Sequence, residues 1–274
     1  MPGILYIVAT PIGNLEDITL RARRILRECD LIACEDTRQT RKLLEHLDIS
    51  KPSVSYHEHN EAGRAGELVA KLKAGAKVAL VSDAGTPLIS DPGYRVVTAA
   101  IDAGVPVIPI PGVTAAMGAL SASGLATDSF RFCGFLPAKT SQRRKMLEQL
   151  KQEACTLIFY ETPHRISDAL TDVEAVMGSR PAVVARELTK IHEEFLRGTA
   201  AEIRAALAGR ASVKGEITLL IGKAESEAGA DDTPLEDAVR AAERQGLSRM
   251  DAIKRVAKER GLSKREVYRS LTGE

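Results

Sequence analysis

The 274-residue sequence has almost no excess charge of either sign. It contains 38 lysines and arginines against 37 aspartates and glutamates, a formal net charge of +1 at pH 7. This balance excludes a protein that attracts nucleic acid over its whole surface. Any surface that binds nucleic acid must therefore be local. The 44% of hydrophobic residues are enough for an ordinary globular core.

Cysteine is scarce and long apolar runs are missing. Cys29, Cys34, Cys133 and Cys155 show no CxxC spacing and lie in or beside apolar runs, so we interpret them as buried thiols. No run of about 18 apolar residues could span a membrane, and the N-terminus has no basic segment before a long apolar stretch. We therefore expect a cytoplasmic protein without a membrane partner.

Three common cofactor motifs are also missing. The sequence has no GxGxxG for a dinucleotide, no GxxxxGK[ST] for phosphate and no HExxH for zinc. His57 and His59, with Glu61 nearby, could begin a metal site if both imidazoles lay on one strand face. A third ligand cannot be placed, and no metal is predicted.

Short apolar runs alternate with amphipathic segments up to residue 112. The strand-like runs are 5–10, 31–36, 53–58, 77–83 and 105–111, and the helical patterns are 18–29, 38–47, 62–74 and 93–103. Strands that are apolar at consecutive positions are typical of a parallel sheet covered on both faces. The pattern predicts a mostly parallel α/β domain over residues 1–112.

A second alternating series predicts another α/β domain over residues 113–224. Pro109, Pro111 and Gly112 end the first series, and Thr114 could cap a following helix. The strand-like runs are 130–137, 155–162, 181–187, 193–198 and 216–222, and the helical patterns are 141–150, 165–177 and 200–208.

The chain then changes to helical patterns only. Residues 225–233 are small and polar, as in a linker, and residues 234–274 predict a small helix-turn-helix-like module. Ser248 with Asp251, and Ser263 with Glu266, have the spacing of capping boxes. Gly261 has the position of a helix C-cap.

This helical module concentrates basic charge. From residue 240 onward it holds ten basic residues and five acidic ones. Such a cluster suits contacts with RNA phosphates. The candidate RNA-binding residues are Arg249, Arg255, Lys258, Lys264, Arg265 and Arg269, together with Arg38 in the first domain.

Polar residues follow all five predicted strands of the first domain. Because ligands of open parallel sheets bind beyond the carboxyl ends of the strands, these residues predict a cleft there. The loop DAGTPLISDPGYR (83–95) is the most unusual segment. Its glycines permit rare backbone conformations and its prolines stiffen the turn, so its main chain could hold a small polar molecule.

Eight ordered motifs carry a resemblance to a known family. They are YIVATPIGNLEDIT, ACEDTR, YHEHNE, VSDAGTPLISDPGYR, PIPGVTAAMGALSASGL, FCGFLP, FYETPHRI and ARELTKIHEEFLRG, and they span about residues 4–222. The sequence resembles the tetrapyrrole-methylase superfamily, in particular its branch that methylates a cytidine ribose 2′-hydroxyl in 16S rRNA of the small ribosomal subunit. The superfamily's GxGxGD-like turn is ATPIGN here and its GGDP is AGTP, which argues against a corrin or porphyrin substrate.

The resemblance implies a fold, a cofactor and an oligomer. We expect two α/β domains, the first with a mostly parallel sheet and the second with a mixed one, a homodimer, and S-adenosylmethionine bound between the domains. The implied cofactor-binding residues are Pro11, Asp83, Ala84, Gly85, Thr86, Ile89, Thr114, Ala115, Glu161, Leu188, Glu216 and Ile217. Glu161 and Leu188 depart from the superfamily's side chains, and Leu188 and Ile217 could equally be core residues.

The implied reaction is an in-line displacement that positioning can accelerate. A ribose hydroxyl is a weak nucleophile, so a base would help to remove its proton. Asp36, Glu58 and Glu187 are candidate bases, and Lys190 and Arg186 could stabilise the developing alkoxide. A surface ion pair or an RNA-orienting contact is an equally good interpretation of each.

Three alternatives remain at this point. The protein could be another enzyme of the same superfamily that acts on a tetrapyrrole or a protein side chain. It could be a non-catalytic ribosome-assembly factor that binds RNA through its tail. It could also be a metal-dependent hydrolase built on His57 and His59.

Overall fold

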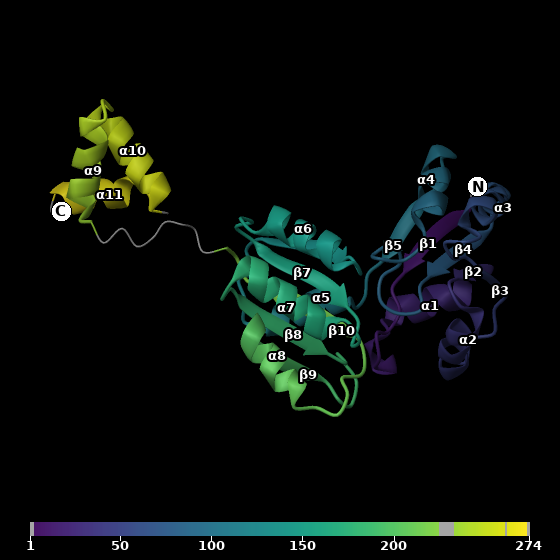
Figure 1. The fold of residues 1–274 in the computed structure, drawn as a ribbon. Helices are drawn as coiled ribbons and strands as arrows, with labels where there is room; N and C mark the ends of the chain where they lie inside the picture. The colour runs from purple at the N-terminus through teal and green to yellow at the C-terminus, as the bar shows by residue number, and fades with distance from the viewer. Residues whose placement is uncertain (1–2, 225–232, 261, 273–274) are drawn as a thin grey trace. The chain divides into compact units, whose positions relative to one another are not determined.

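The computed structural model describes residues 3–224, 233–260 and 262–272. The chain divides into two compact units, Met1–Ala224 and Glu225–Glu274. The first unit contains two separate sheets (Figure 1). We call each sheet with its helices the first and the second lobe. Most of the predicted linker, residues 225–232, and the predicted C-cap Gly261 lie outside the described residues.

The first sheet has five parallel strands in the order β3-β2-β4-β1-β5. The strands are β1 (Ile4–Val8), β2 (Leu31–Cys34), β3 (Ser53–Ser55), β4 (Lys77–Val81) and β5 (Val107–Ile110). In the register of β1 with β4, Ile4 pairs with Lys77. Every strand is shorter than the run predicted for it.

Four helices cover both faces of this sheet. They are α1 (Leu20–Glu28), α2 (Thr37–His46), α3 (Glu61–Lys73) and α4 (Tyr94–Asp102). The buried side chains of α1 and α2 pack in one apolar cluster, and those of α3 and α4 pack in another on the opposite face. This double coverage explains the continuous apolar strands. A short 3-10 helix, η1 (Leu15–Asp17), was not predicted, and Asn14 caps it by accepting a hydrogen bond from the Glu16 amide.

The second sheet is mixed, with the order β6-β7-β10-β8-β9. The strands are β6 (Phe130–Phe135), β7 (Thr156–Glu161), β8 (Pro181–Arg186), β9 (Glu194–Thr199) and β10 (Ile217–Ile221). Only β6 and β7 are parallel; the other neighbours in this sheet are antiparallel. The expected combination of a parallel first sheet and a mixed second sheet is confirmed.

Helices also cover both faces of the second sheet. They are α5 (Ala115–Ser123), α6 (Thr140–Leu150), α7 (Ile166–Met177) and α8 (Ala200–Ala208). The helix α5 packs on one face, while α6, α7 and α8 build the larger apolar core on the other. Thr114 stands at the N-cap of α5, but its side chain makes no capping hydrogen bond. Thr114 therefore has the predicted N-cap position, but its hydroxyl does not accept the hydrogen bond expected of a cap.

The second unit is a three-helix module with its own core. Its helices are α9 (Leu235–Arg244), α10 (Arg249–Glu259) and α11 (Lys264–Thr272), of which α9 was not predicted individually. Ser248 caps α10, and Ser263 and Glu266 form the predicted capping box of α11. Val239, Ile253 and Val267 are buried between the helices. No helix in the described part of the chain is long and apolar enough to cross a membrane.

Candidate functional site

The carboxyl ends of β1 and β4 form the crevice of the first lobe. The helices that follow these neighbouring strands, α1 and α4, pack on opposite faces of the sheet. Such a switch point is where open α/β sheets bind ligands. Beyond the sheet the two chains stay joined, because Thr10 and Gly85 exchange backbone hydrogen bonds of 2.8 and 3.0 Å. The Thr10 hydroxyl also donates to the Ser82 carbonyl at 3.1 Å.

The loop after β4 is held in an unusual backbone conformation. Gly85 has a φ of +80°, and the non-glycine residues Leu88 and Ser90 have φ values of 73° and 66°. A left-handed conformation at a non-glycine residue costs roughly 1–3 kcal/mol, and residues in this conformation are often found at functional sites. Residues 84–86 and 89–91 of this loop line a cavity.

That cavity has a volume of about 260 Å³ and receives residues from both lobes. The first lobe contributes the loop after β4, and the second lobe contributes the segments that end β7, follow β8 and precede β10. The lining residues are Ile12, Ala84, Gly85, Thr86, Ile89, Ser90, Asp91, Thr114, Ala115, Phe135, Tyr160, Glu161, Thr162, Pro163, Ala185, Leu188, Gly215, Glu216, Ile217 and Thr218.

Ten of the twelve predicted cofactor-binding residues line this cavity. They are Ala84, Gly85, Thr86, Ile89, Thr114, Ala115, Glu161, Leu188, Glu216 and Ile217. Pro11 is buried beside the lining residue Ile12. Asp83 is exposed and accepts a 3.0 Å hydrogen bond from the Asp36 amide. The structure thus brings together residues that lie up to 133 positions apart in the sequence.

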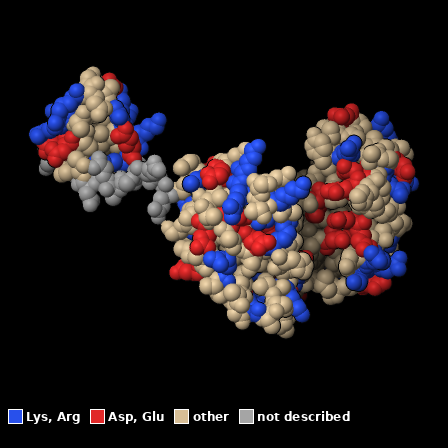
Figure 2. Space-filling view, viewed as in Figure 1, with Lys and Arg blue, Asp and Glu red and all other residues tan. Residues whose placement is uncertain are grey.

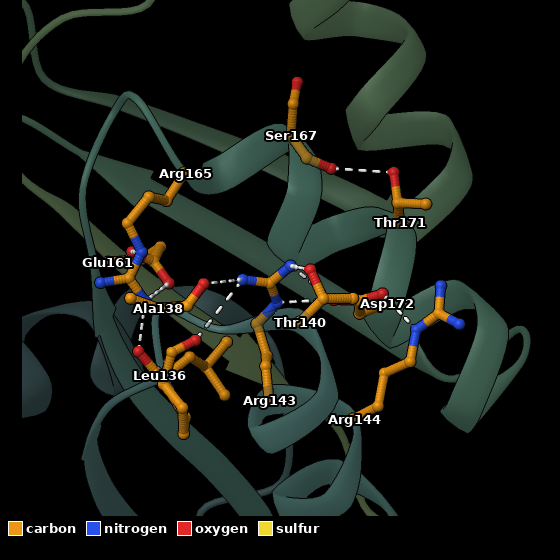
Figure 3. A network of polar contacts seen from close by, with 11 residues as sticks. Leu136, Ala138, Thr140, Arg143, Arg144, Glu161, Arg165, Ser167, Thr171 and Asp172 are labelled. Carbon is orange, nitrogen blue, oxygen red and sulfur yellow. Dashed lines mark hydrogen bonds and ion pairs between the residues drawn. The ribbon is translucent and has the colours of Figure 1, made fainter.

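A buried polar network fixes the second-lobe wall of the cavity (Figure 3). The Glu161 side chain, fully buried, forms an ion pair with Arg165 at 3.3 Å, and Arg165 also donates to the Leu136 carbonyl. Burial raises the pKa of Glu161, although hydrogen bonds and nearby arginines act in the opposite direction. Behind it, Arg143 pairs with Asp172 at 2.6 Å and donates to the carbonyls of residues 137 and 138.

The segment after β8 joins the two lobes. Lys190 forms ion pairs with Glu187 at 2.7 Å and with Glu216 at 3.1 Å. The hydrogen bond to Lys190 lowers the pKa of Glu187. Gly13 packs so closely against Lys190 that a Cβ would lie 2.5 Å from its Cγ, and the Asn14 amide donates to the Thr189 hydroxyl at 3.0 Å. The ATPIGN turn is therefore a contact with the second lobe.

None of the four predicted catalytic residues is among the residues that line the cavity. Asp36 caps α2 and pairs with Arg38 at 2.7 Å, and this hydrogen bond lowers the pKa of Asp36 to about 2. Glu58 is exposed in the turn after β3. Glu187 and Lys190 flank the lining residue Leu188 in sequence, and Arg186 pairs with Glu194 at 3.1 Å. The assignment of catalytic roles to the four residues stays a prediction.

Sequence reasoning did not single out several lining residues. Tyr160 lines the cavity and makes edge-to-face contacts with Phe132 and Phe135. Ser90 and Asp91 belong to the loop whose composition was noted, yet the residue types alone did not assign them to the site. The available signal was the segment DAGTPLISDPGYR, in which both residues lie.

The predicted arrangement of His57 and His59 is wrong. The strand β3 ends at Ser55, so both imidazoles lie in the following turn rather than on one strand face. Asn60 fixes that turn by accepting a hydrogen bond from the His57 amide. No group of three or more metal-ligating side chains is found among residues 3–224, 233–260 and 262–272.

All seven predicted RNA-binding residues are exposed. In the helical module, basic side chains lie on the outer faces of the helices (Figure 2). Arg255 pairs with Glu259 on the same helix. Arg38, in the first lobe, pairs with Asp36, and Figure 2 shows acidic side chains gathered on this lobe. Basic side chains are thus distributed unevenly over the surface of the protein.

Comparisons with known proteins show close similarity to rRNA methyltransferases. The chain is 51% identical over 271 residues to ribosomal RNA small subunit methyltransferase I of Halalkalibacterium halodurans, a match that covers 97% of this chain and 93% of the relative. It is 50% identical to the protein of that name in Synechocystis, over 97% of this chain and 96% of the relative.

Solved structures show the same fold at low sequence identity. Uroporphyrin-III C-methyltransferase from Thermus thermophilus, in complex with S-adenyl homocysteine, matches with a TM-score of 0.57 and 20% identity, over 81% of this chain and 98% of that one. Diphthine synthase matches with a TM-score of 0.60 and 15% identity, over 80% and 90%. Residues 4–204 match the tetrapyrrole (corrin/porphyrin) methylases, and this chain belongs to that family.

Proposed function

We propose that this protein transfers the methyl group of S-adenosylmethionine to the ribose 2′-hydroxyl of a cytidine in 16S rRNA, at the decoding centre of the small ribosomal subunit. The observation that carries the proposal is the match to small-subunit rRNA methyltransferases, at 50–51% identity over 97% of the chain. That match extends beyond residue 204, where the family match ends.

The cavity fits a donor that is part nucleoside and part amino acid. Ala185, Leu188 and Ile217 offer an apolar wall, and Thr86 and Thr114 offer hydroxyls. Residues 84–86, around the positive φ of Gly85, line the cavity, and their backbone groups would recognise a polar ligand without side-chain charge. When bound, S-adenosylmethionine supplies a methyl group on a positively charged sulfur. The twelve predicted cofactor residues, including Pro11 and Asp83 at the edge, would hold it.

The RNA contacts are proposed for the helical module and for Arg38. The module's exposed cations are Arg249, Arg255, Lys258, Lys264, Arg265 and Arg269. Their phosphate contacts would give affinity that falls steeply with salt. Because the apolar side chains of the module are buried in its own core, its surface can carry charged side chains.

We also propose a cytoplasmic homodimer. Tyr94 and Ile101, seven residues apart on one face of α4, are 75% and 59% exposed. Exposed apolar side chains that share a helix face are typical of an interface. Light scattering of the purified protein would measure its mass in solution.

A methyl-acceptor assay tests the proposed function. Purified protein with labelled S-adenosylmethionine is offered isolated small subunits, free 16S rRNA and a porphyrinogen. We expect label in the small-subunit rRNA, recovered after nuclease digestion as a 2′-O-methylcytidine. Label in the porphyrinogen would contradict the proposal in favour of another enzyme of the family. No transfer, together with no heat in calorimetry with S-adenosylmethionine, would indicate a non-catalytic assembly factor.

A further inference from the structure

Three carboxylates line the cavity, and their surroundings differ. Glu161 is buried in an ion pair with Arg165. Glu216 has a side chain that is 73% exposed and pairs with Lys190. Asp91 is partly buried, and no ion pair between the described residues includes it. Asp91 is therefore the carboxylic residue of the lining that has no ion pair with another described residue.

The groups around Asp91 come from three elements and none of them is basic. Ser82, after β4, is one of the groups that act on the pKa of Asp91, while its hydroxyl donates to the Ala84 carbonyl at 3.2 Å. The negative charges of Glu35, after β2, and Asp83, after β4, act on the Asp91 carboxyl. The charge of Asp91 in turn acts on Tyr160 of β7. Burial, with the charges of Glu35 and Asp83, raises the pKa of Asp91 to about 6, although the Ser82 side chain acts in the opposite direction. A base is most effective when its pKa lies near the working pH.

The backbone holds Asp91 in place on both sides. Ser90, just before it, has a φ of 66°, and Gly93, two residues after it, has a φ of 144°. A Cβ at Gly93 would lie 2.9 Å from Leu88 Cδ1 and 3.0 Å from Leu80 Cδ2. Only glycine fits there, so the turn that carries Asp91 packs directly against the core of the first lobe.

We propose that the Asp91 carboxylate accepts the proton of the ribose 2′-hydroxyl as the hydroxyl oxygen attacks the methyl carbon, a role that rests on the proposed function. The oxygen forms its bond to that carbon while the carbon–sulfur bond breaks. The electron pair of the broken bond stays on sulfur, which becomes a neutral thioether. Asp91, now a neutral carboxylic acid, returns its proton to solvent.

The other carboxylates at the crevice are less suited to this step. Asp36 has a pKa of about 2 because Arg38 donates to it, so it holds a proton poorly at neutral pH. The Lys190 hydrogen bond lowers the pKa of Glu187. Neither residue lines the cavity. Asp91 combines a position in the lining with a high proton affinity.

The experiment compares Asp91→Asn and Asp91→Glu with the wild type. Asp102→Asn is the matched control, because Asp102 is an exposed carboxylate at the end of α4 outside the cavity. Single-turnover methyl transfer to small subunits is followed between pH 5 and 8. Two further readouts do not depend on activity: the affinity for S-adenosylhomocysteine by calorimetry, and the Asp91 carboxyl titration by NMR in the protein alone.

We expect Asp91→Asn to slow transfer by roughly 10²–10⁴-fold, the usual contribution of a positioned base. Its affinity for S-adenosylhomocysteine should stay within about threefold, because a residue that acts only on the chemical step does not change ligand binding. The wild-type rate should fall below an apparent pKa near 6 that belongs to Asp91 coupled with Glu35 and Asp83. Asp91→Glu should keep part of the rate and the acidic limb.

Three results would overturn this role. The first is an Asp91→Asn variant that transfers as fast as Asp102→Asn. The second is a loss of S-adenosylhomocysteine affinity that matches the loss of rate, which would make Asp91 a donor-binding residue. The third is an Asp91 carboxyl that titrates near pH 4. A wild-type protein that labels no ribose would instead contradict the proposed function, and the role of Asp91 with it.

Discussion

The α/β unit and the helical module use polar residues in opposite ways. In the α/β unit, Arg143 and Asp172 form an ion pair with side chains only 3% and 2% exposed. In the module, the pairs Arg240–Glu236 and Lys254–Asp251 lie within single helices and are about half exposed. Buried pairs fix geometry, since both charges lose their water and must stay together. Exposed pairs add little stability and leave charge available to a partner.

The backbone shows the same contrast. In the α/β unit, five non-glycine residues among those described adopt positive φ, and two of them, Leu88 and Ser90, belong to the cavity loop. Within residues 233–260 and 262–272 no such residue occurs, and serines cap α10 and α11. A small donor needs a shaped cavity, whereas RNA phosphates need exposed charge. Each unit therefore has the local structure that its proposed ligand requires.

Removal of the buried charge of Asp172 should have the largest effect. Asp172→Asn leaves Arg143 buried without its counterion, and we expect a loss of about 3–5 kcal/mol in the free energy of unfolding. Denaturant titration measures it. The matched control is Glu236→Gln in the module, where the exposed pair should change stability by less than about 0.5 kcal/mol. Equal losses at the two sites would contradict the contrast between the units.

Substitution of Gly85 tests the strained loop. Gly85→Val places a β-branched residue at a φ of +80°, which costs roughly 1–3 kcal/mol, and we expect the donor affinity to fall by about 10- to 100-fold. Calorimetry with S-adenosylmethionine measures the affinity. Gly104→Val is the control, because Gly104 has a φ of +70° but follows α4 away from the cavity. It should lower stability alone. Donor binding that survives at Gly85 would show that the loop tolerates rearrangement.

The high pKa of Asp91 has a consequence for stability. The pKa of the Asp91 carboxyl is about 6 in the folded protein and about 3.9 in the unfolded chain. Its contribution to the free energy of unfolding is therefore least favourable at a pH above both values, where the carboxyl is ionised in the folded and in the unfolded state. The stability that its protonated form contributes is therefore lost as the pH rises through about 4 to 6. We expect Asp91→Asn to be about 1–3 kcal/mol more stable than the wild type at pH 8 and equal to it near pH 3. Thermal unfolding at both pH values checks this, with Asp102→Asn expected to change neither.

Charge removal in the module should have the smallest effect. We expect the triple variant Lys258→Gln, Lys264→Gln and Arg265→Gln to bind small-subunit rRNA about tenfold more weakly and to lower the salt dependence of binding, as loss of phosphate contacts does. The substituted side chains are exposed, so the fold should persist. Filter binding at several salt concentrations measures both quantities. An unchanged salt dependence would show that the RNA contacts lie elsewhere on the protein. The affinity for S-adenosylmethionine serves as the control and should not change.

Local patterns in the sequence were sufficient to predict the strands and most of the helices of both lobes, but not the 3-10 helix η1. Consecutive apolar residues predicted the buried strands, and the spacing of Ser263 and Glu266 predicted the cap of α11. These features depend on neighbours within a few positions, which residue type alone largely determines. The motifs of the family resemblance also predicted ten of the residues that line the cavity.

Tertiary structure decided which polar groups come together at the cavity and how strongly each of them holds a proton. Asp36 and Asp91 are both aspartates at the crevice edge, yet Arg38 lowers the pKa of one and burial raises the pKa of the other. The same holds for Glu187, whose carboxylate pairs with Lys190 where the two lobes meet. Proton affinity depends on burial and on charges from distant segments, and the fold alone brings these together.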